Sequence, residues 1–539
     1  MSRLNPLFAA AAALALVPGL AGAADRDWPS YNRTVTSERF SPLAEINRDT
    51  VKGLKVLCTY DTGMQVSFQT GLIKVGRALY GTAGGDTFSL DADTCAANWR
   101  VHQEGDTGYL RVNRGLAFLD GRLFRGFADG RVVAYDARTG KALWKSPIAN
   151  PTRGESVPAA PVAWNGMVFV GNAGGDSKGV KGRMYALDAA TGRILWEAYL
   201  VPKAPTDPVL GPPAPPSPPE IARSWTNTAG FPITGGATWT SYTLDPKLGL
   251  LYVPGGNPAP DFVNANREGD NLYTGSVVVL DARTGAYVRH FQLVPHDFHD
   301  WDVSTPPTLV TTKAGRQLMA VAPKDGFLYG FDLKTGERLY RNPVTTILNA
   351  DVPLGPQETH FCPGSQGGAE WNGAAYDPAN NLVFTGEVDW CDTVKVASDQ
   401  KLISVALGQA WSGSDMADPK DSFGRVDPVS QWAGWMTASD ADTGAPKWKF
   451  KAPTPLMGGT TPTAGGLVVF GDMAGTLYAF DADKGEQLWA AKIGGAIGGG
   501  VITYQGAAGR QRIAVAAGMT SPIWPTEKTT AKVVVLGLQ

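Results

Sequence analysis

The sequence is poor in charge, in cysteine and in histidine. Only 18% of its 539 residues are charged, the formal net charge is −2, and neither a long basic run nor an acidic tail is present. This balance excludes nucleic acid and an anionic membrane surface as expected partners. The CxxCH motif does not occur in the sequence either, so we expect no covalently attached c-type haem.

Long apolar runs are also scarce. One run spans 7–20, follows Arg3 and ends at the small-residue pattern AGA at 21–23, which is the order of a secretory signal peptide. We therefore predict cleavage after Ala23, loss of residues 1–23 and a periplasmic location. The run is shorter than the roughly 18 residues of a membrane-spanning helix, so stable membrane insertion is not expected.

Turn residues, by contrast, are abundant, with 65 Gly and 39 Pro, and a pattern recurs among them. Seven times an Asp is followed four residues later by Gly, or once by Cys, and eight residues later by Trp, Tyr or Arg. The clearest copies read DARTGKALW, DAATGRILW and DADKGEQLW, and each follows an apolar run such as RMYALD. The seven pairs are Asp91/Trp99, Asp136/Trp144, Asp188/Trp196, Asp281/Arg289, Asp332/Tyr340, Asp440/Trp448 and Asp481/Trp489.

This pattern predicts a strand, a tight turn with a positive φ at the Gly, and a second strand. Consecutive copies lie 41 to 52 residues apart, which is typical of β-propeller repeats. Two larger gaps of 93 and 108 residues are long enough to hold further sheets without a clean motif. We therefore predict an all-β propeller in which residues 24–539 form one domain, and we expect the C-terminal run KVVVLGL to pair with the first sheet.

Three segments are predicted to be long loops. The proline density of residues 201–220 excludes both strand and helix, so we expect an extended surface loop that is either a spacer or a lid or docking strip. Residues 257–275 and 390–435 are polar and rich in Gly or Asp. Because functional loops of propellers gather on one face, these two segments are candidates for lining a substrate entrance.

The four cysteines are expected to be oxidised in an exported protein. Four cysteines allow three pairings. The pairing that joins neighbours in the sequence is Cys58 with Cys95 and Cys362 with Cys391, and we propose this one.

The densest polar cluster is HDFHDWD at 296–302. In an extended segment, Asp300 and Asp302 point to the same side, where two carboxylates repel each other unless a cation lies between them. The alternative is a turn in which the Asp side chains bind backbone amides. Zinc binding by His296 and His299 is disfavoured, because their spacing fits a helix and neither Cys nor a third His lies nearby in the sequence.

Together with the repeat, several motifs resemble the pyrroloquinoline quinone (PQQ) dependent alcohol and sugar dehydrogenases of the bacterial periplasm. These motifs are HDFHDWD, GGATWTSYTLDP, VPGGNPAPDF, LRVNRG and GNAGGDSKGVKGRMYALD. The similarity covers essentially the whole mature chain, and the motifs occur in the order of that family. It implies an eight-bladed β-propeller that holds PQQ on its axis, on a metal cation, and passes electrons to a cytochrome.

The resemblance also implies a metal site. Asp300 matches the family's catalytic aspartate when His299 is set against its Trp, and its role would be general base. Asn257 in GGNPAP matches an amide ligand, and Asp176 in GNAGGD stands where the family usually has Glu. Asp302 matches an additional acid that the family associates with lanthanide use, so the expected cation is Ca²⁺ or a lanthanide.

The cofactor-binding residues follow in the same way. Trp239 resembles the flat floor under the quinone, and a planar tricyclic ring gains from stacking on indole. Arg114 in VNRG resembles the arginine that pairs with a quinone carboxylate. Lys324 in APKDG resembles the catalytic cation that lies at the reactive quinone oxygen. Gln69 and Glu370 complete the set. Without the resemblance, Trp239 is equally a core aromatic, and Arg114 and Lys324 are equally surface charges.

Three departures from the family pattern stand out. The adjacent Cys-Cys pair that many members carry before VNRG is absent, with Gly108 and Tyr109 in its place. His299 replaces a Trp and either alters the substrate wall or offers a second titrating group beside Asp300. Glu370 stands where Asn is frequent and adds an acid near the cofactor.

We therefore expect an enzyme that oxidises a primary, secondary or polyol alcohol to the carbonyl with PQQ, with Asp300 accepting the hydroxyl proton. Electrons would leave to a separate periplasmic cytochrome c-type acceptor. One alternative is a PQQ-dependent aldose or polyol dehydrogenase. The other is a non-catalytic periplasmic propeller scaffold of the outer-membrane assembly type, which the fold alone does not exclude.

Overall fold

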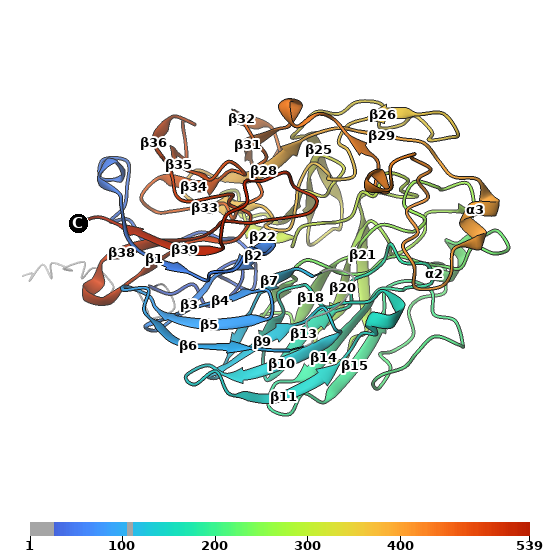
Figure 1. Cartoon of the computed structure of the whole chain (residues 1–539), viewed down its shortest axis with the longest axis horizontal. Helices are drawn as coiled ribbons and strands as arrows, with labels where there is room; N and C mark the ends of the chain where they lie inside the picture. Colours follow the sequence, from blue (N-terminus) through green and yellow to red (C-terminus); the bar gives the residue numbers. More distant parts are fainter. Residues whose placement is uncertain (1–25, 105–110) are drawn as a thin grey trace, which may run out of the picture.

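The structure is a computed structural model that describes residues 26–104 and 111–539. The predicted signal peptide with its cleavage after Ala23, and the Gly108-Tyr109 pair, lie outside the described residues. Within them no helix is long and apolar enough to cross a membrane. The chain has an all-β, propeller-type fold (Figure 1).

The described residues contain eight four-stranded antiparallel sheets. In chain order the first four are β3 (Ile73–Val75), β4 (Ala78–Ala83), β5 (Asp86–Asp91) and β6 (Ala97–His102); β8 (Ala117–Leu119), β9 (Arg122–Gly126), β10 (Arg131–Asp136) and β11 (Ala142–Pro147); β12 (Val162–Trp164), β13 (Met167–Gly171), β14 (Arg183–Asp188) and β15 (Ile194–Tyr199); and β17 (Thr243–Asp245), β18 (Leu250–Pro254), β20 (Ser276–Asp281) and β21 (Tyr287–Gln292).

The remaining four sheets follow the same order. They are β22 (Thr308–Thr311), β23 (Gln317–Val321), β24 (Phe327–Asp332) and β25 (Arg338–Pro343); β27 (Ala375–Asp377), β28 (Leu382–Asp389), β31 (Ala433–Asp440) and β32 (Pro446–Ala452); β33 (Thr461–Pro462), β34 (Leu467–Gly471), β35 (Thr476–Asp481) and β36 (Gln487–Lys492); and β37 (Val501–Gln505), β38 (Gln511–Ala517), β39 (Lys532–Gly537) and β1 (Lys55–Asp61).

Short elements lie between these sheets. They are the parallel pair β2 (Phe68–Gly71) and β7 (Asn113–Gly115), the pair β16 (Thr226–Asn227) and β19 (Arg267–Glu268), the sheet of β26 (Thr359–Phe361), β29 (Asp392–Val394) and β30 (Arg425–Val426), the helices α2 (Glu220–Arg223) and α3 (Asp399–Ser404), and the 3₁₀ turns η1 (Val51–Gly53), η2 (Pro151–Arg153), η3 (Pro419–Asp421), η4 (Val429–Gln431) and η5 (Ala507–Gly509).

The predicted hairpins are confirmed. Each of the seven motif Asp residues ends the third strand of a sheet, and the fourth strand carries the Trp, Tyr or Arg. In the copy at Asp136, the carboxylate Oδ1 accepts hydrogen bonds from the backbone N–H and the hydroxyl of Thr139, at 2.8 and 2.7 Å. Gly140 follows with a φ of 72°, as the turn requires. The motif is therefore a local device that reverses the chain.

In at least four copies, the tryptophan of the motif has a second role, because it docks on the next sheet. The indole N–H groups of Trp99, Trp144, Trp196 and Trp448 donate to the backbone carbonyls of Ala137, Ala189, Ala282 and Ala482, respectively, at 3.0 to 3.1 Å. The ring also lies over the Gly of the next motif: a Cβ placed on Gly285 would lie 2.7 Å from the Trp196 ring. The repeat therefore joins neighbouring sheets as well as neighbouring strands.

The eighth sheet carries no motif, because it is built from both ends of the described chain. Strand β39 pairs with β1 from Lys55↔Gly537 to Asp61↔Lys532, and Figure 1 shows the red β39 beside the blue β1. The C-terminal run therefore pairs with the first strand of the described chain, as predicted, but this strand completes the eighth sheet and does not belong to the first sheet. Both proposed disulfides, Cys58–Cys95 and Cys362–Cys391, are present.

Within the described residues, each long gap contributes one four-stranded sheet, the one that carries the next motif, and no further four-stranded sheet. The additional sheets in the gaps are small, namely the pair β16–β19 and the three-stranded sheet of β26, β29 and β30. The rest of each gap forms loops and short helical turns. The segment 201–220 is irregular up to residue 219, and a one-turn helix begins at Glu220. Its backbone at Leu210 and Gly211 donates to the Glu197 carboxylate on β15, so the loop is tied to the sheet beside it.

The strand order decides where the loops gather. In an antiparallel four-stranded sheet, the connection from the second to the third strand and the exit to the next sheet lie at the same end. Asp176, Asn257 and Lys324 lie on connections of the first kind, whereas Trp239 and Asp300 lie on those of the second kind. The motif turns join the third and fourth strands and therefore lie at the opposite end.

Candidate active site

Four acidic side chains from three loops meet at this end of the sheets. Asp176, Asp261 and Asp300 each offer a carboxylate oxygen, and these oxygens all lie within 4.8 Å of one another. Asp261 and Asp300 are buried, and Asp176 is partly exposed. Asp302 lies beside them, and one of its oxygens accepts a hydrogen bond from the backbone N–H of Asn257 at 3.0 Å.

A single lysine faces this group of carboxylates. The Lys324 ammonium lies 3.1 Å from Asp300 Oδ2 and 2.8 Å from Asp302 Oδ2. One positive charge therefore pairs directly with two carboxylates, whereas the negative charges of Asp176 and Asp261 have no cation in direct contact among the described residues. A buried group of like charges needs a further cation, since isolated charges in a low dielectric are costly.

The pKa values reflect the same excess of negative charge. Burial raises the pKa of Asp300 well above its ordinary range; Lys324 opposes this, and the charges of Asp302 and Asp176 add to it. Burial and the neighbouring acids likewise raise the pKa of Asp261, and burial with the charge of Asp302 raises that of Asp176 to about 6. Burial alone would lower the pKa of Lys324, but the carboxylates raise it well above its usual value, so the lysine is charged.

The donor set fits a hard metal cation. Carboxylate and amide oxygens are the ligands that Ca²⁺ and similar ions prefer. Asp261 Oδ2 is buried and has no hydrogen-bond partner among the described residues. The side-chain N–H₂ of Asn257 donates to Asp261 Oδ1 at 2.9 Å and to the Pro258 carbonyl at 3.2 Å, which leaves the amide oxygen as the donor atom for a cation. The residues present therefore match the expected metal site.

A flat aromatic surface adjoins the carboxylates. The Arg114 guanidinium lies 4.5 Å from the ring centre of Trp239 and 4.9 Å from that of Trp371, and the Lys324 ammonium lies 5.5 Å from the Trp239 ring. Arg114 donates to the Trp239 carbonyl at 2.8 Å, but its buried Nε–H has no partner among the described residues. Two cations beside an indole face suit a planar anionic ligand.

Glu370 and Gln69 lie at the margin of this surface. Glu370 is buried next to Trp371, and burial raises its pKa to about 7, although the charges of Lys324 and Arg114 lower it. Gln69 lies on β2, which pairs with the strand that carries Arg114, and its buried Oε1 has no hydrogen-bond partner among the described residues. Both positions are compatible with the expected contacts to a cofactor.

His299 is not a titrating group beside Asp300. Its ring is buried and stacks on Trp301 with ring centres 4.0 Å apart, and Phe361 packs edge-on at 4.8 Å. Burial lowers the pKa of His299 to about 3, so the ring is neutral at neutral pH. The alternative that His299 supplies a second titrating group is therefore wrong, and the ring packs against Trp301 and Phe361.

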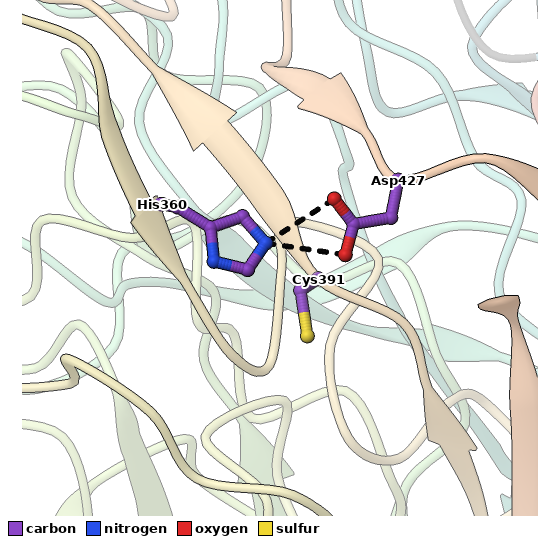
Figure 2. Close-up of side chains that lie close together, drawn as sticks. All are labelled: His360, Cys391 and Asp427. Carbon is purple, nitrogen blue, oxygen red and sulfur yellow. Dashed lines mark hydrogen bonds and ion pairs between the residues drawn. The ribbon is translucent and has the colours of Figure 1, made fainter.

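A second group of possible metal ligands lies elsewhere, and it does not form a metal site. Figure 2 shows His360, Cys391 and Asp427 close together, with the His360 ring nitrogen 3.1 and 3.2 Å from the two carboxylate oxygens. The sulfur of Cys391 is bonded to Cys362, so it offers no thiolate to a metal. The pair of His360 and Asp427 instead links β26 to the segment after β30.

Sequence reasoning missed two residues of the site. Asp261 lies in the same quoted motif as Asn257, VPGGNPAPDF, and a search for every acid in the motifs would have found it. Trp371 follows Glu370 and gave no local signal, because an isolated tryptophan is as often a core residue. Its indole N–H donates to the Gly498 carbonyl at 2.7 Å, a contact that only the fold brings about.

Comparison with known families identifies the family of the chain. Residues 28–355 match the PQQ family described as glucose/ethanol/alcohol dehydrogenase, beta-propeller domain, and residues 433–532 match the family described as outer membrane protein assembly factor BamB. The first match covers more than half of the chain. The chain therefore belongs to the family of PQQ-dependent alcohol dehydrogenases.

Relatives of known activity extend over most of the chain. The quinohemoprotein alcohol dehydrogenase ADH IIB of Pseudomonas putida is 31% identical over 91% of this chain and 73% of its own length. The lanthanide-dependent methanol dehydrogenase of Methylacidiphilum fumariolicum is 28% identical over 91% of this chain and 84% of its own length. Among solved structures, the quinohemoprotein alcohol dehydrogenase of Comamonas testosteroni has a TM-score of 0.84 at 26% identity and covers 96% of this chain and 81% of its own.

Proposed function

We propose that this protein oxidises an alcohol to the corresponding carbonyl, with PQQ and one Ca²⁺ or lanthanide ion bound among the loops of the active site. We also infer that the eight four-stranded sheets are the blades of one ring and that residues 24–539 form a single domain. The observation that carries the proposal is a group of carboxylates beside an indole face flanked by Arg114: Asp300 and Asp302 contact Lys324, and Asp176 lies against Asp300.

The roles of the residues follow from their surroundings. PQQ and its cation would supply the oxidant and a Lewis acid when bound. Arg114 would bind a carboxylate of the cofactor through its fork of donors, and Trp239 would support the planar ring. Asp176, Asn257, Asp300 and Asp302 would hold the cation. Gln69 and Glu370 would contact the edge of the cofactor.

Asp300 is the proposed general base. Its Oδ2 lies 3.1 Å from the Lys324 ammonium, which orients the carboxylate and favours its ionised form. A bound cation would lower the pKa of Asp300 further, because an opposite charge nearby stabilises the anion. The ionised carboxylate would then accept the proton of the substrate hydroxyl. Lys324 would in addition stabilise negative charge that develops on the cofactor.

The proposal also covers the location of the protein and its electron acceptor. The predicted signal peptide supports export to the periplasm, and the lack of a CxxCH motif in the sequence supports electron transfer to a separate cytochrome c-type acceptor. A PQQ-dependent aldose or polyol dehydrogenase is the nearest alternative, since the residues that bind the cofactor would be the same. A non-catalytic scaffold is disfavoured, because burying several carboxylates beside one lysine is costly and would serve no purpose in a protein that binds neither metal nor cofactor.

A substrate survey tests the proposal. The purified protein would be incubated with PQQ and either Ca²⁺ or La³⁺, and then assayed for reduction of an artificial electron acceptor with primary alcohols, secondary alcohols, polyols and aldoses. We expect turnover with at least one alcohol and none without PQQ. Activity on aldoses alone would show that the substrate is a sugar and not a simple alcohol. Absence of activity with every metal and substrate would refute the proposal that the protein is an enzyme.

A further inference from the structure

Asp261 is a buried carboxylate that the proposed mechanism does not use. It lies on the loop between β18 and β20, four residues after Asn257, and its side chain is 0% exposed. Its Oδ1 accepts the Asn257 amide hydrogen bond, and its Oδ2 has no partner among the described residues. A buried carboxylate oxygen without a partner is costly, and it points to a missing positive ligand.

The nearby cations of the chain are engaged elsewhere. Lys324 pairs with Asp300 and Asp302. Arg267, whose charge also acts on Asp261, donates to the side chain of Asn271 and to the backbone carbonyls of Pro260 and Asp297. Neither of these cations therefore occupies the space at Asp261 Oδ2.

We propose that Asp261 is itself a ligand of the bound cation and that its charge makes the site select a trivalent over a divalent ion. This inference rests on the proposed metal site and adds a carboxylate to it. The cation would then face four aspartates, Asp176, Asp261, Asp300 and Asp302. Among the described residues, Lys324 is the opposing charge in direct contact with this group.

The preference follows from Coulomb's law. The energy between two charges scales with their product, so an additional carboxylate attracts a trivalent ion about 1.5 times as strongly as a divalent ion at the same distance. Asp261 also holds Asn257 through the amide hydrogen bond, so it fixes the orientation of a second ligand. Loss of a group that orients a metal ligand typically costs about 10- to 100-fold in metal affinity.

The variant Asp261→Asn tests the proposal, because it removes one charge and keeps the size of the side chain. Binding of Tb³⁺ would be measured by luminescence on the metal-free protein without PQQ or substrate, with La³⁺ and Ca²⁺ as competitors. Lifetimes in H₂O and D₂O count the water molecules on Tb³⁺. We expect about a 10- to 100-fold loss of Tb³⁺ affinity, a smaller loss for Ca²⁺, and an additional bound water.

A matched control is Asp472→Asn. Asp472 is also fully buried, but it binds the Tyr478 hydroxyl and the Thr476 N–H of another sheet, so its replacement should leave Tb³⁺ binding unchanged. Asp261→Ser, checked for native circular dichroism, replaces Asp261→Asn if that variant does not fold. Equal Tb³⁺ affinity and equal hydration in wild type and variant would overturn the role of Asp261 alone. Absence of cation binding by the wild type would overturn the metal site as a whole.

Discussion

Replacement of Asp300 by Asn separates the role of the carboxylate as a base from its role as a hydrogen-bond partner of Lys324. The Asn side chain has nearly the same shape and keeps an oxygen toward the Lys324 ammonium, which lies 3.1 Å from Asp300 Oδ2. It does not act as a base. General base catalysis typically contributes about 10²- to 10⁴-fold to a rate, which corresponds to roughly 3 to 5 kcal/mol of barrier. We expect Asp300→Asn to lower kcat by that factor at saturating PQQ and metal.

The same substitution should lower kcat but should not lower the stability of the metal-free protein. Burial and the nearby acids raise the pKa of Asp300 well above its ordinary range, so its charge is unfavourable in the metal-free folded protein at neutral pH. The lysine is not left alone, because Asp302 lies 2.8 Å from it. The metal-free variant should therefore unfold at the same or a higher denaturant concentration than the wild type.

The assay measures turnover by reduction of an artificial electron acceptor, after absorbance has shown equal loading with PQQ. Asp472→Asn is the control, because it replaces a buried carboxylate outside the site and should keep wild-type turnover. A kcat of Asp300→Asn within about tenfold of the wild type lies below the smallest effect expected for a general base. Such a result would remove Asp300 from that role.

Three further predictions concern the frame that holds the site. Trp196→Ala should lower the free energy of unfolding by about 3 to 5 kcal/mol, because the buried indole packs on Gly285 of the next sheet; a loss below about 1 kcal/mol in a urea titration would contradict this docking role. Burial raises the pKa of Asp392 to about 6, so the folded protein binds a proton more tightly than the unfolded chain, and this contribution to stability is lost as pH rises through 6. Between pH 4 and 7 the wild type should lose about 2 kcal/mol more than Asp392→Asn, and parallel pH profiles would refute the assignment. The Cys58–Cys95 disulfide joins the sheet of β1 to that of β5 across 37 residues; the double Ser variant should unfold with about 3 to 5 kcal/mol less stability, and an unchanged thermal midpoint would contradict that estimate.

The sequence predicted the repeated hairpins because their causes are local. Asp136, Thr139 and Gly140 form one turn within five residues, and the same spacing recurs in each copy. The aromatic docking is also regular, so the pattern of Trp and Gly was sufficient to predict the propeller-type fold. The strand β39 was predicted from its apolar composition alone.

The site was harder to predict, because its residues are distant in the sequence. Asp176, Asp261 and Asp300 come from three loops, and only the strand order brings their carboxylates within 4.8 Å. Family motifs identified two of the three, whereas Asp261, although it lies in the motif VPGGNPAPDF, was not recognised as part of the site. His299 shows the converse error: its type suggested titration, but its burial between aromatic rings keeps it neutral. Burial and partners depend on tertiary structure, so residue type alone did not decide either role.

The most direct test of the account is equilibrium binding of PQQ to the metal-free protein, followed by absorbance as Ca²⁺ or La³⁺ is added. The account predicts one PQQ per chain and binding that is at least about tenfold tighter with the metal than without it, since the cation compensates the buried carboxylates. PQQ that does not bind, or that binds equally well with and without metal, would contradict the claim that the loops at this end of the sheets form a single cofactor and metal site.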